Sequence, residues 1–169
     1  NEDIIKVQNI QHQIKKYLDL VSNNSEDLVL RSLHDLFEAI VRTNAFQLNA
    51  SGKFKEYLSF KLNPHKILHL VAPIPYAEVF VYSNHFEAVH LRGGKIARGG
   101  IRWSDRGEDY RTEALGLMKA QMTKNSVIVP VGSKGAFFIK SNNTSFAKEA
   151  YLEHVIECYK NFLRGILDV

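Results

Sequence analysis

Between Gly94 and Lys140 the sequence places cations next to glycines, a combination suited to binding a small anion. One cation lies in Arg98-Gly99-Gly100, and a second, Lys134, lies in Gly132-Ser133-Lys134-Gly135. Glycine lets a backbone approach a ligand closely, and guanidinium or ammonium groups form charge-assisted hydrogen bonds with carboxylate or phosphate. We therefore expect a glycine turn that brings backbone N–H groups and Arg98 onto a carboxylate. A hairpin turn with a solvated arginine is the alternative.

Gln121 and Lys124 have the spacing of neighbours on one face of a helix. They lie near the end of a helix expected from Asp109 to Lys124, so both could hold the same carboxylate. The alternative is that Lys124 only caps the helix, because a cation in the last turn interacts favourably with the helix dipole.

Lys134 is expected just beyond a buried strand at residues 126–131, in a loop formed by Gly132–Gly135. In open α/β sheets, ligands bind outside the carboxyl ends of the strands. A lysine held there is a candidate for proton transfer in a reaction. A solvent-exposed loop lysine is the alternative.

Arg92-Gly93-Gly94 and Arg98-Gly99-Gly100 also form two Arg-Gly-Gly repeats, which suggests RNA binding as a competing function. Disordered RNA-binding tracts repeat this unit many times among polar residues. Here the unit occurs twice between strand-like apolar segments. The net charge of +4 is small and is not concentrated in blocks. RNA therefore stays the second hypothesis, behind a small anionic ligand.

The surrounding pattern predicts the elements that must hold these residues. Helical spacing over the first 43 residues gives way to the alternation typical of half-buried strands. The later helix leads directly into a β-branched apolar run, which indicates a mixed α/β domain. The second helix is expected to bury five apolar side chains: Leu30, Leu33, Phe37, Ile40 and Val41. The expected helices span residues 2–21, 26–43, 109–124 and 151–167, and the expected strands span 57–62, 78–82, 86–91, 126–131 and 136–139.

The composition bounds the remaining possibilities. The 169 residues are one domain's length, and 45% hydrophobic with 24% charged residues is ordinary for a globular protein. The single cysteine, Cys158, excludes an internal disulfide framework and favours a reducing cytoplasm.

No apolar run approaches the ~20 residues that span a bilayer. The histidines are scattered, so no metal site is expected. P-loop and Gly-x-Gly-x-x-Gly patterns are absent, so no Rossmann dinucleotide site is expected. The start at Asn1 suggests a fragment of a longer protein.

The run from Tyr82 to Lys140 closely resembles the large NAD-specific glutamate dehydrogenases of bacteria. The similarity extends over at least residues 57–168, and the first helices are less distinctive. The matching stretches are His90–Lys95, Ala97–Arg106, Tyr110–Glu113, Leu115–Met122 and Val127–Gly135.

The resemblance implies a specific reaction and specific roles. The family deaminates L-glutamate to 2-oxoglutarate and ammonia, and passes a hydride to NAD. Shorter members bind substrate with a Lys-Gly-Gly turn and with a glutamine and a lysine three residues apart, and use a catalytic lysine in a glycine-rich loop. By position these correspond to Arg98-Gly99-Gly100, to Gln121 and Lys124, and to Lys134. Arg98 replaces the lysine, the spacings differ by about two residues, and Ala136 replaces a second glycine.

The resemblance also implies what this chain lacks. The catalytic aspartate and the NAD-binding domain of the family lie downstream, and Asp168 is not assigned to that role. We expect an α/β, amino-acid-dehydrogenase-like substrate domain with a mixed sheet at residues 51–169, preceded by a helical pair at residues 1–50. The isolated chain is expected to be inactive. The full enzyme is expected to be a cytoplasmic homo-oligomer that acts on L-glutamate and binds neither nucleic acid nor membrane.

Overall fold

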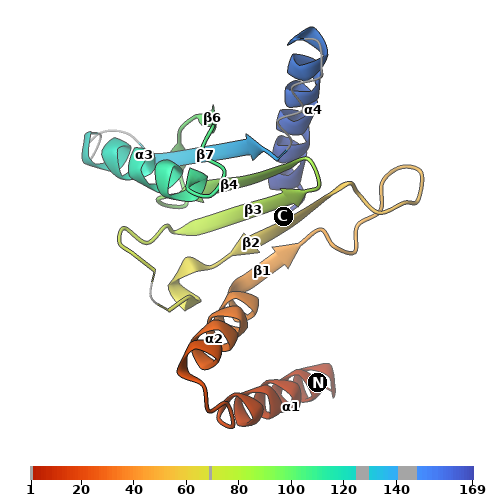
Figure 1. The fold of residues 1–169 in the computed structure, drawn as a ribbon, viewed down its shortest axis with the longest axis vertical. Coiled ribbons are helices and arrows are strands. Elements are labelled where there is room, and N and C mark those ends of the chain that lie inside the picture. Colours follow the sequence, from red (N-terminus) through yellow and green to blue (C-terminus); the bar gives the residue numbers. More distant parts are fainter. Residues whose placement is uncertain (1, 69, 125–129, 141–147) are drawn as a thin grey trace.

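A seven-stranded mixed sheet with a helix on each face forms the body of the protein (Figure 1). The computed structural model describes residues 2–68, 70–124, 130–140 and 148–169. The helices are α1 (Glu2–Leu18), α2 (Asn24–Ala39), α3 (Tyr110–Lys124) and α4 (Lys148–Leu167), with a short 3₁₀ turn, η1, at Pro64–Lys66. The strands are β1 (Ile40–Thr43), β2 (Tyr57–Leu62), β3 (Ala77–Ser83), β4 (Phe86–Arg92), β5 (Ala97–Arg98), β6 (Ile101–Trp103) and β7 (Val131–Ile139).

The sheet combines an antiparallel part with a parallel edge. Its strand order is β1-β2-β3-β4-β7-β5, with β6 also pairing with β7. The pairs from β1 to β4, and the pair of β4 with β7, are antiparallel, whereas β5 and β6 run parallel to β7. The expected α/β class with a mixed sheet is confirmed.

Alternation along the strands divides the core into two layers. In β4, Ala88 packs under α4 and the next residue, Val89, packs under α3, because successive strand side chains point to opposite faces. The α4 layer includes Phe162 and Phe137, and the α3 layer includes Met118. α3 therefore lies against β4 and β7 on one face, where its later residues can reach the parallel edge.

Two predictions about the elements are wrong. The second helix ends at Ala39, and the next four residues form β1, which pairs with β2. Gly132–Gly135 is not a loop, because all four residues lie inside β7. The predicted strand over residues 126–131 falls mostly outside the described residues, and only its last residue, Val131, is seen to begin β7.

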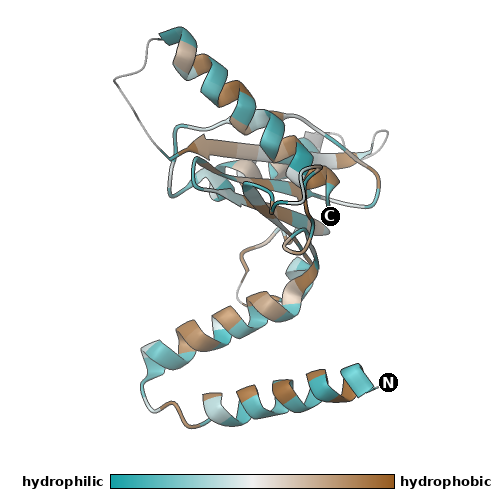
Figure 2. Cartoon of the chain, turned by 90° about the vertical axis from the view of Figure 1, so that its right-hand side faces the viewer, coloured by the Kyte–Doolittle hydropathy of each residue, from teal (hydrophilic) through white to brown (hydrophobic). Residues whose placement is uncertain are grey.

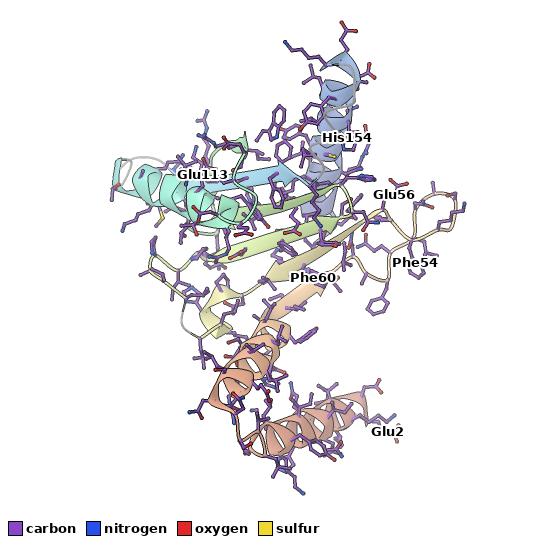
Figure 3. All side chains as sticks on the ribbon, in the orientation of Figure 1. Glu2, Phe54, Glu56, Phe60, Glu113 and His154 are labelled. Atoms are coloured by element: carbon purple, nitrogen blue, oxygen red, sulfur yellow. The ribbon has the colours of Figure 1, made fainter. Side chains whose placement is uncertain are left out.

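The apolar faces of the helical pair are exposed, contrary to the predicted burial. α1 and α2 extend away from the sheet, and apolar positions recur along both helices (Figure 2). Phe37 is 70% exposed, and Leu30, Leu33 and Val41 are also exposed. The face of α2 nearest the sheet borders an open apolar groove of about 530 Å³, which is also lined by Phe60 (Figure 3) and Phe80. No helix within the described ranges has the length and apolar content needed to cross a membrane.

Candidate functional site

The glycine segment that follows β5 lies along the parallel edge of β7. Arg98 pairs with Gly132 and Ile101 pairs with Gly135. The same register, continued between these two pairs, places Gly99 beside Ser133 and Gly100 beside Lys134. The Gly135 N–H donates to the Gly100 carbonyl oxygen at 3.1 Å. Two of the predicted site segments are therefore adjacent in space, although 34 positions separate Gly100 from Lys134 in the sequence.

Gln121 joins this pair of segments from α3. Its side-chain Nε2 donates to the Arg98 carbonyl oxygen at 2.8 Å, which fixes the orientation of the amide. Its Oε1 is buried and has no hydrogen-bond partner among the described residues. Gln121 thus presents a free acceptor beside the glycine backbone.

The two glycines of Arg98-Gly99-Gly100 have different reasons to lack a side chain. A Cβ on Gly99 would overlap the Ser133 carbonyl oxygen and lie 3.1 Å from Gln121 Oε1. Gly99 therefore permits close packing of β5 and β6 on β7. A Cβ on Gly100 would meet no atom within 4 Å. Contacts within the described protein do not require glycine at Gly100, so close approach of a ligand can account for it.

Lys134 lies in the middle of β7 and is half-buried. It pairs with Leu91 of β4, and strand alternation places it on the same face as Ala136, which packs under α3. The predicted position in a loop is wrong, because Lys134 lies inside β7 and pairs with Leu91 of β4. A lysine on a rigid strand has a better-defined position than one on a loop.

The other two predicted cations are less constrained. Arg98 is exposed, and no ion pair or side-chain hydrogen bond is seen for it within the described ranges. Lys124 ends α3 one turn beyond Gln121, but its side chain lies outside the part of the chain that is described. The structure thus brings Gln121, Gly99, Gly100 and the Lys134 backbone together, and leaves the Lys124 side chain unplaced.

A second polar cluster, not predicted from the sequence, joins the first turn of α3 to the end of β6. Glu113 accepts a hydrogen bond from Ser104 Oγ at 2.6 Å and pairs with Arg102 Nε at 2.8 Å (Figure 3). Ser104 is 2% exposed, and its N–H donates to the Phe137 carbonyl oxygen of β7. An acid in the first turn of a helix was visible in the sequence, but it is commonly explained by the helix dipole alone.

Burial shifts the pKa values of two further side chains, His90 and Cys158. Burial, with a smaller effect from Arg92, lowers the pKa of His90, whose Nδ1 is buried without a partner in the described structure. Burial, with the nearby Glu157 carboxylate, raises the pKa of Cys158 to about 11, so its thiol is a poor nucleophile at neutral pH. Among the described residues, no group of three or more His, Cys, Asp or Glu side chains could hold a metal ion.

Comparison with known proteins identifies the family. The family described as "Bacterial NAD-glutamate dehydrogenase, catalytic domain" matches residues 13–169. The chain belongs to this family. The resemblance inferred from the sequence is thereby confirmed.

Individual relatives agree with this assignment. The NAD-specific glutamate dehydrogenase of Pseudomonas aeruginosa is 49% identical over 164 residues, which are 97% of this chain and 10% of that protein. That of Mycobacterium tuberculosis is 44% identical over 158 residues, which are 90% of this chain and 10% of that protein. That of Neurospora crassa is 32% identical over 145 residues, which are 80% of this chain and 13% of that protein. The chain thus spans about a tenth of the length of its bacterial relatives.

Proposed function

We propose that this chain is the glutamate-binding part of an NAD-dependent glutamate dehydrogenase. In this proposal, its α/β body is a substrate domain of the amino-acid-dehydrogenase type. The observation that supports it best is the meeting of Gly99, Gly100, Gln121 and the Lys134 backbone at one edge of the sheet, in a chain of the glutamate dehydrogenase family. The relatives named above are NAD-specific glutamate dehydrogenases, so L-glutamate and 2-oxoglutarate are the proposed substrate and product.

The α-carboxylate of glutamate is assigned to Gln121 and Lys124. The Gln121 amide already has a fixed orientation beside Gly99, and Lys124 follows one turn later on the same helix. Arg98 is exposed and free to meet a carboxylate of the substrate. Each ion contact at ~4 Å has a Coulomb energy of about 4 kcal/mol at an effective dielectric near 20, before desolvation is subtracted. Two or three such contacts favour a dicarboxylate over a neutral amino acid.

Lys134 is assigned the catalytic role. Its side-chain amine would accept a proton from the water as that water attacks the imine, and the ammonium so formed would stabilise the carbinolamine. The rigid backbone of β7 and the adjacent Gly100 support this assignment, because a reacting group must be held within hydrogen-bond reach of its target. The unoccupied volume beside Gly100 leaves room for a substrate at this edge.

NAD would accept the hydride from the substrate, but the residues of this chain do not fit a dinucleotide. The turns between its strands and helices carry no Gly-x-Gly-x-x-Gly pattern, and the glycines at Gly99 and Gly132 are packed against protein atoms. We therefore assign NAD, and an acidic catalytic partner, to parts of the full-length protein outside this chain. The isolated chain is expected to show no dehydrogenase activity, and reduction of NAD by the pure chain would contradict this.

Substitutions in the full-length protein test the site. Lys134→Ala should reduce kcat by at least 100-fold while KM for glutamate stays within a few-fold, because general acid–base catalysis contributes about 10² to 10⁴. Lys124→Ala should mainly raise KM. Lys119→Ala, an exposed lysine on the same helix, is the matched control and should behave as wild type. Near-normal turnover of Lys134→Ala would remove it from catalysis, and an unchanged KM would remove Lys124 from the carboxylate site.

No observation in the described structure favours the RNA hypothesis. Arg92 ends β4 and Arg98 ends β5, and the Gly93 N–H donates to the Gly132 carbonyl oxygen at 2.9 Å. Each Arg-Gly-Gly segment thus begins at the last residue of a strand and continues as ordered backbone beside β7. Cytoplasmic location and homo-oligomerisation of the full enzyme stay predictions, and light scattering with and without the helical pair would test the second.

A further inference from the structure

Glu113 connects the two elements that carry the proposed glutamate site. Its Oε1 pairs with Arg102 Nε at 2.8 Å, and its Oε2 accepts from Ser104 Oγ at 2.6 Å. The Glu113 side chain is only 11% exposed, so water competes weakly for either oxygen. Arg102 and Ser104 lie in and just after β6, whereas Glu113 belongs to the first turns of α3.

The cluster is connected to the proposed glutamate site through both β6 and α3. Arg102 follows Gly100 by two residues, and Gln121 follows Glu113 by two helical turns on α3. The Ser104 N–H donates to the Phe137 carbonyl oxygen at 2.8 Å, which holds the end of β6 on β7. Glu113 thus links β6, which follows Gly100 directly, to the helix that carries Gln121.

A general helix-terminus effect does not account for this arrangement. An acid near a helix N-terminus is favourable wherever it points, as Asp109 illustrates. Asp109 pairs with Arg106 at 3.3 Å, and both of these side chains are more than half exposed. Glu113 differs because its side chain is only 11% exposed and has two side-chain partners in and just after β6.

We propose that Glu113 is a positioning residue for the glutamate site, acting through Arg102 and Ser104. This inference rests on the proposed function. Loss of the carboxylate charge should release β6 from α3 and shift the glycine backbone relative to Gln121, so binding of glutamate should weaken more than turnover.

The test uses steady-state kinetics of the full-length enzyme with Glu113→Gln. Gln is nearly isosteric and can still accept from Ser104 Oγ, but it cannot form the ion pair with Arg102. KM for glutamate should rise at least tenfold, while kcat falls less than threefold and KM for NAD stays within twofold. Asp109→Asn is the matched control, and all three of its constants should stay within twofold of wild type.

Arg102→Gln tests the same link from its exposed side. The Arg102 side chain is 54% exposed, so this variant should fold even if Glu113→Gln does not. If the two residues act through each other, the double variant should raise KM no more than the larger single change. Fully additive effects, or a KM within twofold of wild type in the folded single variants, would overturn the inference. A purely structural role predicts loss of soluble enzyme with normal constants in the enzyme that remains.

Gln121→Ala separates failure of this inference from failure of the proposed function. A raised KM for Gln121→Ala with an unchanged KM for the Glu113 and Arg102 variants would overturn only the positioning role. Unchanged KM values in all of these variants would remove the glutamate site itself from this edge of the sheet.

Discussion

Replacing Gly99 by alanine should disrupt the parallel edge of the sheet, whereas the same change at Gly100 should not. The added methyl at Gly99 would overlap the Ser133 carbonyl oxygen, which belongs to the β7 backbone. A backbone oxygen cannot rotate away as a flexible side chain can, so the two strands must separate. At Gly100 the methyl would meet no atom within 4 Å. The two adjacent glycines thus form a matched pair.

The loss of local stability expected for Gly99→Ala follows from the kind of contact that the methyl would make. Overpacking in a well-packed region costs about 1–3 kcal/mol, and a clash with backbone belongs at the upper end or beyond. A local loss of about 3 kcal/mol corresponds to roughly 150-fold in an opening equilibrium, because each 1.4 kcal/mol is about tenfold. The Gly135 N–H, which donates to the Gly100 carbonyl, should report this loss.

Amide hydrogen exchange of the full-length protein measures the effect where it occurs. In Gly99→Ala, protection of peptides that cover β5, β6 and the first half of β7 should fall about 100-fold, while β2 and β3 stay protected. Gly100→Ala should keep wild-type protection throughout, yet raise KM for glutamate if a ligand approaches this backbone. Protection within about threefold of wild type in Gly99→Ala would refute the argument that Gly99 is required for packing.

The boundary between α2 and β1 shows where local pattern stops being informative. Ile40 and Val41 continue the apolar spacing of the preceding helix, so the sequence predicts helix through residue 43. Both residues are β-branched and lose side-chain freedom in a helix. The chain turns into extended backbone at Ile40, where antiparallel pairing with β2 is available. Pairing with β2 determines where α2 ends, and the local sequence pattern does not predict that position.

Gly132 and Gly135 misled the prediction for a related reason. Glycine is depleted in strands, so two glycines around Lys134 suggest a loop. In the structure, a Cβ at Gly135 would lie 2.9 Å from the Ile101 side chain, and one at Gly132 would lie 3.1 Å from Gln121 Oε1. Each glycine makes room for a neighbour that is distant in the sequence. The residues of the candidate site stay a prediction, whereas the strand setting of Lys134 could not be read from the sequence.

The helical pair shows what hydrophobic periodicity does not predict. The apolar spacing of α1 and α2 correctly indicated helices, and it also implied a buried face. Phe37 is nevertheless 70% exposed in this chain. Periodicity states that a helix has an apolar face, but it does not state which part of a protein covers that face. The Glu113 cluster was missed similarly, because Arg102, Ser104 and Glu113 become partners only when α3 and β6 both fold against β7.

Two further predictions concern stability. The first compares a buried ion pair with an exposed one. Arg111→Ala should cost about 3–5 kcal/mol, because Glu78 is almost fully buried and accepts two hydrogen bonds from Arg111, at 2.8 and 2.7 Å. For a chain of this length, thermal unfolding should shift down by roughly 6–20 °C. Arg31→Ala, at an exposed pair, should lower the thermal midpoint far less, and equal shifts for the two variants would contradict the argument. The second prediction concerns pH. Burial alone would raise the pKa of Asp168, but hydrogen bonds from Lys55 and other groups outweigh it, and the pKa is lowered. A lowered pKa in the folded state means that ionised Asp168 stabilises the fold above its unfolded pKa of about 3.9. That contribution disappears as pH falls through the lower folded value. Asp168→Asn should therefore lower the urea midpoint at pH 7 and weaken its fall between pH 5 and 2. Parallel curves for the two proteins would show that the contact with Lys55, at 2.6 Å, adds no pH-dependent stability.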